Sequence, residues 1–177
     1  MPLIDKGEPL ARLVDLDSVQ LFDEMGPTVQ ILELPTSDDL PCIIRGVVPP
    51  GFIVPLHSHA EPETFVHLSG VLEGLVVSPE GATWVPVRPG QVFHVPGHVR
   101  HAWRNPSAEP AVSICISTPT MGRFFIEAGT PVTPGAPPAP PSAGVIQRFL
   151  DTAARYGYWT ATPEENEQVG ITLPGPA

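Results

Sequence analysis

The chain has 177 residues, of which 42% are apolar, so one packed domain with extensions is expected and global disorder is excluded. Its formal net charge is −10, from 9 basic and 19 acidic residues, and the basic residues form no cluster. Because nucleic acids and anionic membranes bind positively charged faces, neither is expected as a partner. The 25 prolines and 16 glycines favour short strands joined by turns over long helices.

Residues 1–40 carry no chemical motif, and we expect them to form an N-terminal extension that packs on the following domain. The first residues, MPLIDKGEPLAR, lack the pattern of a secretion signal, and no apolar run approaches the length of a membrane span. Cys42 and Cys115 lie far apart in strand-like runs, which indicates buried free thiols. These features predict a cytoplasmic protein.

Residues 41–118 are predicted to form the main domain, because short β-type runs alternate there with Gly- and Pro-rich turns. Many short strands at this spacing are typical of an all-β sandwich or barrel. The predicted strands read, in chain order, CIIRGVV, FIVPLH, TFVHL, VLEGLVV, TWVPV, QVFHV, HAWRN and AVSICIS.

Residues 119–141 are expected to form a connector, which includes the Pro-rich, extended segment PVTPGAPPAPP at 131–141. Residues 142–177 should then form a C-terminal helix and tail. Ser142 is placed to cap a helix over residues 144–156, and Gly157 is placed to end it. One face of this helix is apolar and predicts a docking surface: Ile146, Phe149, Leu150 and Ala153.

All six histidines lie between positions 57 and 101, and several have the spacing of a metal site. In the stretch HSHAEPE, His57 and His59 alternate so that they point the same way from a strand, and Glu63 begins the next strand. His101 follows about forty residues later. Three imidazoles and one carboxylate on neighbouring strands form a ligand set suited to Fe, Mn, Ni, Co, Cu or Zn.

Two longer stretches contain these residues at fixed spacing. The first, GFIVPLHSHAEPETFVHLSG, has Gly51, His57, His59, Glu63 and Gly70, and the second, GQVFHVPGHVRHAWRN, has Gly90, Pro96, His101 and Asn105. Together they resemble the two-part signature of the cupin superfamily. The second stretch departs from it once, because the family usually has glycine two residues after the proline and this chain has His98. The turn is therefore expected to be shifted, which would let His98 reach the pocket mouth.

The resemblance covers residues 40–118 and implies an all-β double-stranded β-helix, or jelly-roll cupin barrel, here followed by a short C-terminal helix. It also implies that His57, His59, Glu63 and His101 are metal ligands. Strand parity places Phe65 and His67 on the inward face with Glu63, and Trp103 on the face of His101, so these three are expected pocket residues. Glu61 is expected to be a solvated turn residue.

The tail sequences RFFIEAGTPV and AARYG resemble small bacterial, quercetin dioxygenase-like cupins. This resemblance implies a dioxygenase that acts on a small organic substrate, an enol or phenol, with Glu63 as both ligand and catalytic base. One divalent transition metal is expected, Fe first, with Mn, Ni, Co, Cu or Zn as alternatives, and no organic cofactor. A non-redox metal-dependent isomerase, lyase or decarboxylase and a small-molecule-binding cupin remain alternatives, and cupins of this kind allow a homodimer.

Overall fold

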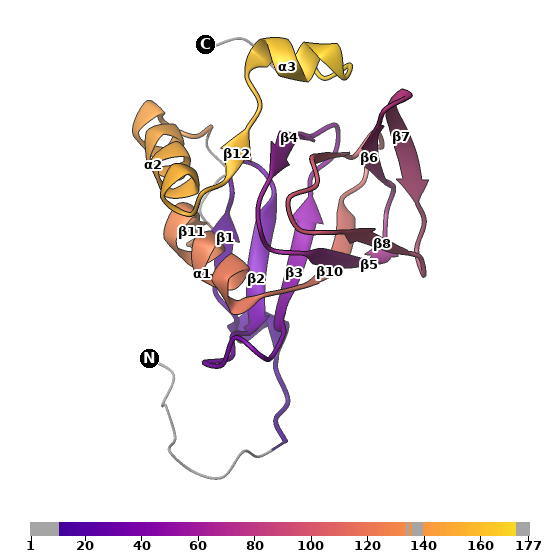
Figure 1. The fold of residues 1–177 in the computed structure, drawn as a ribbon. Helices are drawn as coiled ribbons and strands as arrows, with labels where there is room; N and C mark the ends of the chain where they lie inside the picture. Colours follow the sequence, from indigo (N-terminus) through magenta and orange to yellow (C-terminus); the bar gives the residue numbers. More distant parts are fainter. Residues whose placement is uncertain (1–10, 134, 136–139, 173–177) are drawn as a thin grey trace.

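The computed structural model describes residues 11–133, 135 and 140–172, and two antiparallel sheets face each other within them (Figure 1). The expected all-β jelly-roll fold is confirmed. The first sheet contains, from edge to edge, β11 (Thr130–Pro131), β1 (Leu21–Asp23), β2 (Thr28–Glu33), β3 (Cys42–Val48), β10 (Ala111–Ser117), β5 (Glu63–Ser69) and β8 (Val92–Val95). The second contains β12 (Trp159–Thr160), β4 (Ile53–Ser58), β9 (His101–Arg104), β6 (Leu72–Ser78) and β7 (Gly81–Val87).

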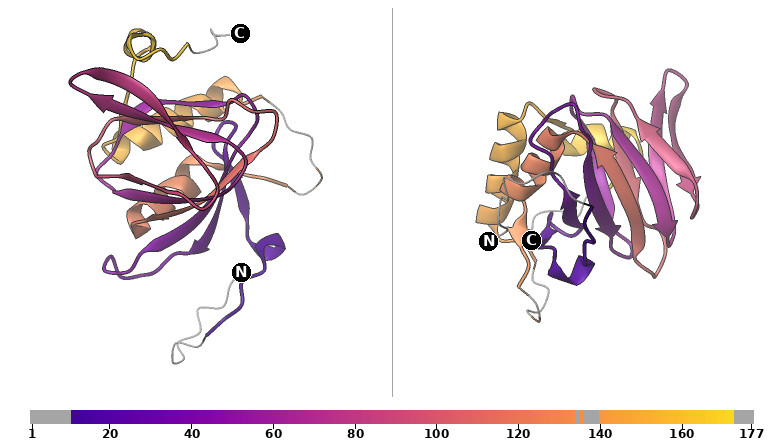
Figure 2. Two further views of the ribbon diagram at one scale, coloured as in Figure 1. Left: turned by 90° about the vertical axis from the view of Figure 1, so that its right-hand side faces the viewer. Right: turned by 90° about the horizontal axis from the view of Figure 1, so that it is seen from below.

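The strands from β3 to β10 form the barrel, because the chain passes repeatedly from one sheet to the other. Seen nearly end on, they outline a closed ring (Figure 2, left). Its interior is filled by apolar side chains from both sheets, among them Leu72, Val87, Val95, Trp103 and Ala111. Each of the eight runs predicted between residues 41 and 118 corresponds to one of these strands.

The segments on either side of the barrel enlarge it. Residues 21–33, within the expected N-terminal extension, form β1 and β2 and lengthen the first sheet beyond β3. Residues 119–128, within the expected connector, form helix α1 (Pro119–Ala128), which begins at the N-cap Thr118. The connector is therefore helical where it leaves the barrel, and residues 134 and 136–139 of its Pro-rich part lie outside the described residues.

Helix α2 (Ala143–Arg155) begins after Ser142, whose side chain accepts a hydrogen bond from the Val145 amide. Gly157 follows with a φ of 75°, a conformation that glycine adopts without strain, so the predicted helix is confirmed at both ends. Phe149 and Ala153 pack against the core, whereas Ile146 and Leu150 remain exposed. Half of the predicted apolar stripe is thus a docking surface within the chain.

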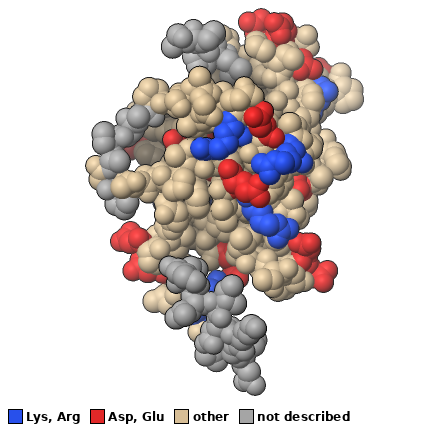
Figure 3. Space-filling model, turned by 90° about the vertical axis from the view of Figure 1, so that its left-hand side faces the viewer, with Lys and Arg blue, Asp and Glu red and all other residues tan. Residues whose placement is uncertain are grey.

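Helices α1 and α2 lie together on one side of the barrel (Figure 2, right). They cover a core cluster that includes Cys42, Ile44, Cys115, Met121 and Phe124. On their outer face acidic and basic side chains are interspersed (Figure 3), and Arg155 pairs with Glu127 at 2.8 Å. No helix in the described part of the chain is long and apolar enough to span a membrane.

The C-terminal segment returns to the barrel after α2. Strand β12 pairs with β4, opposite Ser58 and His57, and helix α3 (Pro163–Gln168) follows with a capping box formed by Thr162 and Glu165. Ile171 is completely buried against Leu56, Leu75 and Ala102. These residues form a separate hydrophobic cluster on the sheet that contains β4. The 3-10 turn η1 (Leu16–Ser18) lies at the other end of the described chain.

Candidate metal centre

A bulge in β4 brings His57 opposite His101. Val54 pairs with Trp103 and His57 pairs with His101, so β4 uses three residues where β9 uses two. The extra residue lies next to Pro55, and proline within a sheet is found mainly at edges and bulges. Without the bulge, strict alternation from the inward-facing Val54 would turn His57 away from the barrel interior. The bulge therefore places His57 in the site.

The loop after β4 and the loop before β9 contact each other beside this pair. The amide of His98 donates a hydrogen bond to the carbonyl oxygen of His59 at 2.6 Å. Gly97 packs so closely on the carbonyl oxygen of Ala60 that any side chain at position 97 would collide with it. His98 itself has a φ of 66°, so this turn holds a non-glycine residue in the left-handed region at the position where the family usually has glycine.

Four side chains converge from both sheets. The candidate ligand atoms of His57, His59 and His101 all lie within 4.8 Å of one another. Glu63, the first residue of β5, comes from the facing sheet, and its Oε2 lies 3.1 Å from His101 Nε2 and 3.5 Å from His59 Nε2. The structure thus brings together all four of the residues predicted as ligands.

Each histidine ring is oriented by a backbone carbonyl two residues away. The Nδ1 atoms of His57, His59 and His101 lie 2.8 Å from Pro55 O, 2.9 Å from Glu61 O and 2.9 Å from Val99 O. Because a carbonyl oxygen only accepts, Nδ1 carries the hydrogen in each ring, and Nε2 of a neutral imidazole keeps its lone pair. Such outer hydrogen bonds are the usual means of orienting a metal-binding histidine.

The electrostatics of the cluster favour a positive charge between these groups. Burial would raise the pKa of Glu63, but the adjacent His101 and His59 outweigh it and hold this pKa well below its usual range. Burial also lowers the pKa of His59, yet the contact with Glu63 reverses this and raises it overall. His57 has no such partner in hydrogen-bond contact, and burial, followed by the proximity of His101, lowers its pKa to about 3. An ionised Glu63 carboxylate therefore lies in the same cluster as the neutral imidazole of His57.

These residues fit a divalent transition metal. Glu63 Oε2 and His101 Nε2 are buried and lack a hydrogen-bond partner among the described residues, although they are only 3.1 Å apart. Two such atoms repel each other unless a cation or a proton lies near both, since each presents a lone pair. Three imidazole nitrogens and one carboxylate oxygen are ligands that Fe, Mn, Co, Ni, Cu and Zn accept. The cluster is compatible with a bound metal ion and leaves its identity open.

The expected pocket residues occupy three kinds of position. Phe65 and Trp103 stack edge to face with ring centroids 4.5 Å apart, within the barrel core. His67 is completely buried, and its nitrogens contact the Ser113 hydroxyl at 3.0 Å and the Gly70 carbonyl at 3.1 Å. His98 is exposed on its turn. Only Phe65 and Trp103 combine an inward position with an apolar surface.

Sequence reasoning missed three residues beside the cluster. Glu61 is buried, and its Oε2 lies 3.8 Å from His59 Nδ1, so the expectation of a solvated turn residue is wrong. The ring of Tyr158, which precedes β12, lies 4.9 Å from the ring of His59. Cys115 donates its thiol hydrogen to Glu63 Oε1 across 3.7 Å. Strand parity could have indicated Cys115, whereas Tyr158 had no local signal.

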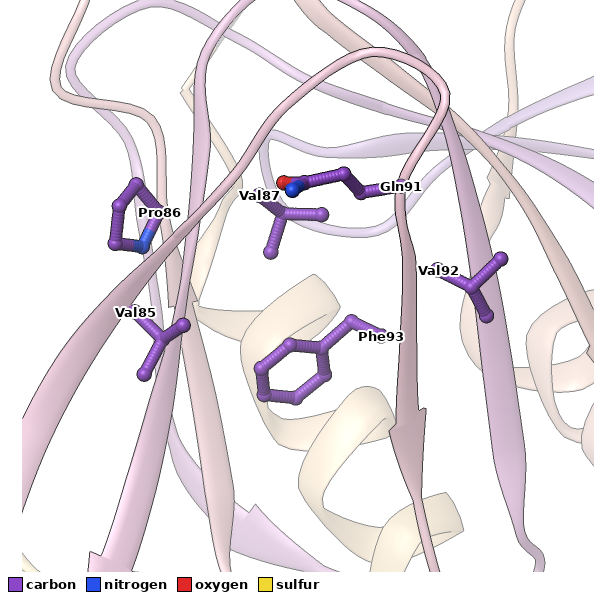
Figure 4. Close-up of a pocket in the computed structure, with 6 residues that line it drawn as sticks. All are labelled: Val85, Pro86, Val87, Gln91, Val92 and Phe93. Atoms are coloured by element: carbon purple, nitrogen blue, oxygen red, sulfur yellow. The ribbon is translucent and has the colours of Figure 1, made fainter.

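A pocket of about 380 Å³ opens where the edge strands β7 and β8 approach each other (Figure 4). The aromatic ring of Phe93 and the amide of Gln91 lie between the two strands in this view. The pocket includes none of the four clustered residues, and the residues that line it are Val85, Pro86, Val87, Gln91, Val92 and Phe93. A second pocket of about 260 Å³ lies near Glu61, Pro62 and the first turn of α1.

With this geometry established, comparison with known proteins identifies the fold. Residues 45–117 match the family model of the cupin domain. Solved structures with a similar backbone include an RmlC-like cupin from Shewanella frigidimarina, with a TM-score of 0.53, 17% identity and coverage of 65% of this chain and 96% of that one. Residues 45–117 therefore form a cupin domain.

Other similar proteins carry different activities in their names. The polyketide cyclase RemF from Streptomyces resistomycificus aligns with a TM-score of 0.51 and 19% identity over 62% of this chain and 80% of that one. Oxalate decarboxylase from Lactobacillus farciminis aligns with a TM-score of 0.52 and 16% identity over 67% of this chain and 36% of that one. At such identities the likeness establishes the fold alone.

One curated relative has higher identity over a shorter stretch. A pyrimidine/purine nucleoside phosphorylase from Escherichia fergusonii is 42% identical over 60 residues, which are 34% of this chain and 60% of that protein. The match thus spans less than two thirds of that relative.

Proposed function

We propose that this protein is an enzyme that acts on a small organic substrate and depends on one divalent transition metal held by His57, His59, Glu63 and His101. The observation that supports the proposal most directly is the 3.1 Å approach of Glu63 Oε2 and His101 Nε2, two buried atoms without hydrogen-bond partners among the described residues. A buried pair of this kind is costly unless a cation compensates it.

The proposed reaction is the dioxygenation of an enol or phenol, with Fe as the metal. A metal at this site would supply Lewis acidity toward a substrate oxygen, and a redox metal would add chemistry with O2. The chain's own residues would orient the substrate and accept its hydroxyl proton, which is the role proposed for the ionised Glu63. The edge-to-face pair of Phe65 and Trp103 in the barrel core would help to exclude water from the site.

A second candidate is a non-redox reaction at the same residues. The 42% identity over 60 residues to a nucleoside phosphorylase favours this alternative, because that activity needs no oxidant. Isomerase, lyase and decarboxylase chemistry belong to the same class, since each uses a metal as a Lewis acid only. A cupin that binds a small molecule without catalysis is the third alternative.

The test begins with elemental analysis of the untagged protein by mass spectrometry, before and after anaerobic reconstitution with Fe(II). Oxygen uptake is then measured with flavonols, catechols and 1,3-dicarbonyl compounds, and phosphate-dependent base release is measured with nucleosides. Near one equivalent of metal and oxygen uptake that His101→Ala abolishes would support the dioxygenase. Base release without oxygen uptake would favour the second candidate, and a protein that takes up no metal would contradict the metal centre.

A small molecule is accordingly the proposed partner, and neither nucleic acid nor membrane is. A homodimer and a cytoplasmic location remain proposals as well. Light scattering of the purified protein across a range of concentrations measures the assembly state, and fractionation of source cells measures the location.

A further inference from the structure

Glu63 has its two carboxylate oxygens in different surroundings. Oε2 faces His59 Nε2 and His101 Nε2, whereas Oε1 accepts a hydrogen bond from Cys115 Sγ at 3.7 Å. Oε2 is buried without a hydrogen-bond partner among the described residues, and Oε1 has one. The two oxygens are therefore already distinguished by the protein.

The position of Cys115 follows from the strand register. In β10, Cys115 pairs with Phe65 of β5, and Glu63 lies two residues before Phe65, on the same face of the sheet. Cys115 and Glu63 are therefore diagonal cross-strand neighbours, close enough for side-chain contact. An ionised carboxylate only accepts hydrogen bonds, so the hydrogen in this contact belongs to the thiol.

We propose that Cys115 is a positioning residue that holds Glu63 with Oε1 turned away from the histidines, so that Oε2 alone is presented to the metal. The inference rests on the metal centre proposed above and adds a residue to it. The thiol fixes the rotation of the carboxylate group, which otherwise could offer both oxygens to a metal. Removing the thiol should therefore weaken binding by loosening the carboxylate, as loss of other outer-shell partners does.

Cys42 provides a matched control. Both cysteines are free, buried and part of the same core cluster under α1, so truncating either one removes the same volume from the same core. Cys42 packs against Gly122 and lies in β3, not beside Glu63. A difference between the two alanine variants therefore reports the contact with the carboxylate and not the loss of packing.

The experiment measures the dissociation constant for Co(II) by competition with a chelator. Cys115→Ala should weaken binding about tenfold, while Cys115→Ser, which keeps a donor, should stay within about threefold of the unaltered protein. Cys42→Ala should stay within about twofold, because it leaves Glu63 untouched. In a Glu63→Gln background, Cys115→Ala should have no further effect beyond that of Cys42→Ala.

The near-ultraviolet spectrum of the Co(II) protein gives an independent readout. A sulfur-to-cobalt charge-transfer band that disappears in Cys115→Ala would overturn the proposal, because the thiol would then be a ligand itself. Equal affinities of Cys115→Ala and Cys42→Ala would overturn it too, while leaving the metal centre intact. Failure of the unaltered protein to bind Co(II), Fe(II) or Zn(II) would reject the metal centre and the role of Cys115 together.

Discussion

His57 and His101 are direct partners across β4 and β9, and the centroids of their rings lie 4.2 Å apart. The bulge next to Pro55 creates this pairing, since it adds one residue to β4 between Val54 and His57. The site therefore depends on strand register as much as on ligand identity, because a slip of one residue would turn His57 to the opposite face of the sheet.

His101→Ala should raise the dissociation constant for Co(II) by about 100-fold or more, because it removes one ligand and leaves a cavity beside His57. The barrel should stay folded, since β9 remains packed through Ala102 and Trp103. Chelator competition and far-ultraviolet circular dichroism check the two parts. His94→Ala is the control, as His94 is exposed and contacts Thr64 Oγ1 at 2.9 Å. Loss of folded protein in His101→Ala would instead indicate that the metal is structural.

Glu63→Gln should weaken metal binding less than His101→Ala does, because the amide keeps an oxygen of the same shape and loses the charge. Turnover should fall further than binding, by about 100-fold, if Glu63 also accepts a proton from the substrate. The comparison needs kcat measured at saturating metal for both proteins. A variant that binds metal weakly and turns over normally once loaded would contradict the proposed role as base.

Glu24 should make the free energy of unfolding depend on pH. Its carboxyl is buried next to Gly129, and this burial raises its pKa from 4.5 to about 8. The negative charge of Asp23 adds a smaller increase to this pKa, and the positive charge of Arg148 lowers it in part. The folded state thus holds this proton more tightly than the unfolded state does. The resulting stability is fully present below about pH 4.5, and it is lost as the pH rises toward 8.

The effect should amount to a few kcal/mol, on the order expected for a shift of this size. Urea unfolding between pH 5 and pH 9 measures it, and Glu24→Gln should flatten the decline because an amide does not titrate. If the unaltered protein and Glu24→Gln showed parallel pH profiles, Glu24 would not be the group responsible.

His98→Gly should be more stable than His98→Ala by about 1 kcal/mol. The φ of 66° strains any residue with a side chain by about 1–2 kcal/mol, which exceeds the extra entropy that glycine loses on folding. The amide that donates to His59 is kept in both variants. Urea unfolding of the two proteins decides the matter, and equal or reversed stabilities would show that the turn relaxes when the histidine is replaced.

Asn166→Ala should cost about 2–3 kcal/mol, since it leaves a buried amide without a partner. The Asn166 side chain is completely buried, accepts from the Leu56 amide at 2.9 Å and donates to the carbonyls of Ala161 and Thr162. It thereby ties the segment after β12 to β4. Limited proteolysis should cut this segment faster in Asn166→Ala, whereas the exposed Gln168→Ala should behave like the unaltered protein.

The barrel strands and the four clustered residues could be predicted because local signals specify them. Gly- and Pro-rich turns separate the strands of the barrel, and the histidine spacing is fixed along the chain. The bulge in β4 could not be predicted, since alternation alone from Val54 would point His57 outward. The strands β1 and β2 have weak patterns of their own and gain their place by pairing with β3. Tyr158 reaches His59 only through tertiary packing.

The late position of β12 in the chain also sets the order in which the site is enclosed. All four clustered residues precede Tyr158 and β12 by more than fifty positions, and β12 then pairs with the strand that carries His57. During synthesis the barrel strands through β10 emerge from the ribosome first. The cluster can therefore assemble while the edge of β4 is still exposed to solvent. The arrival of β12, with Trp159 stacked under Arg100 at 4.1 Å, then covers the edge of β4, the strand that carries His57.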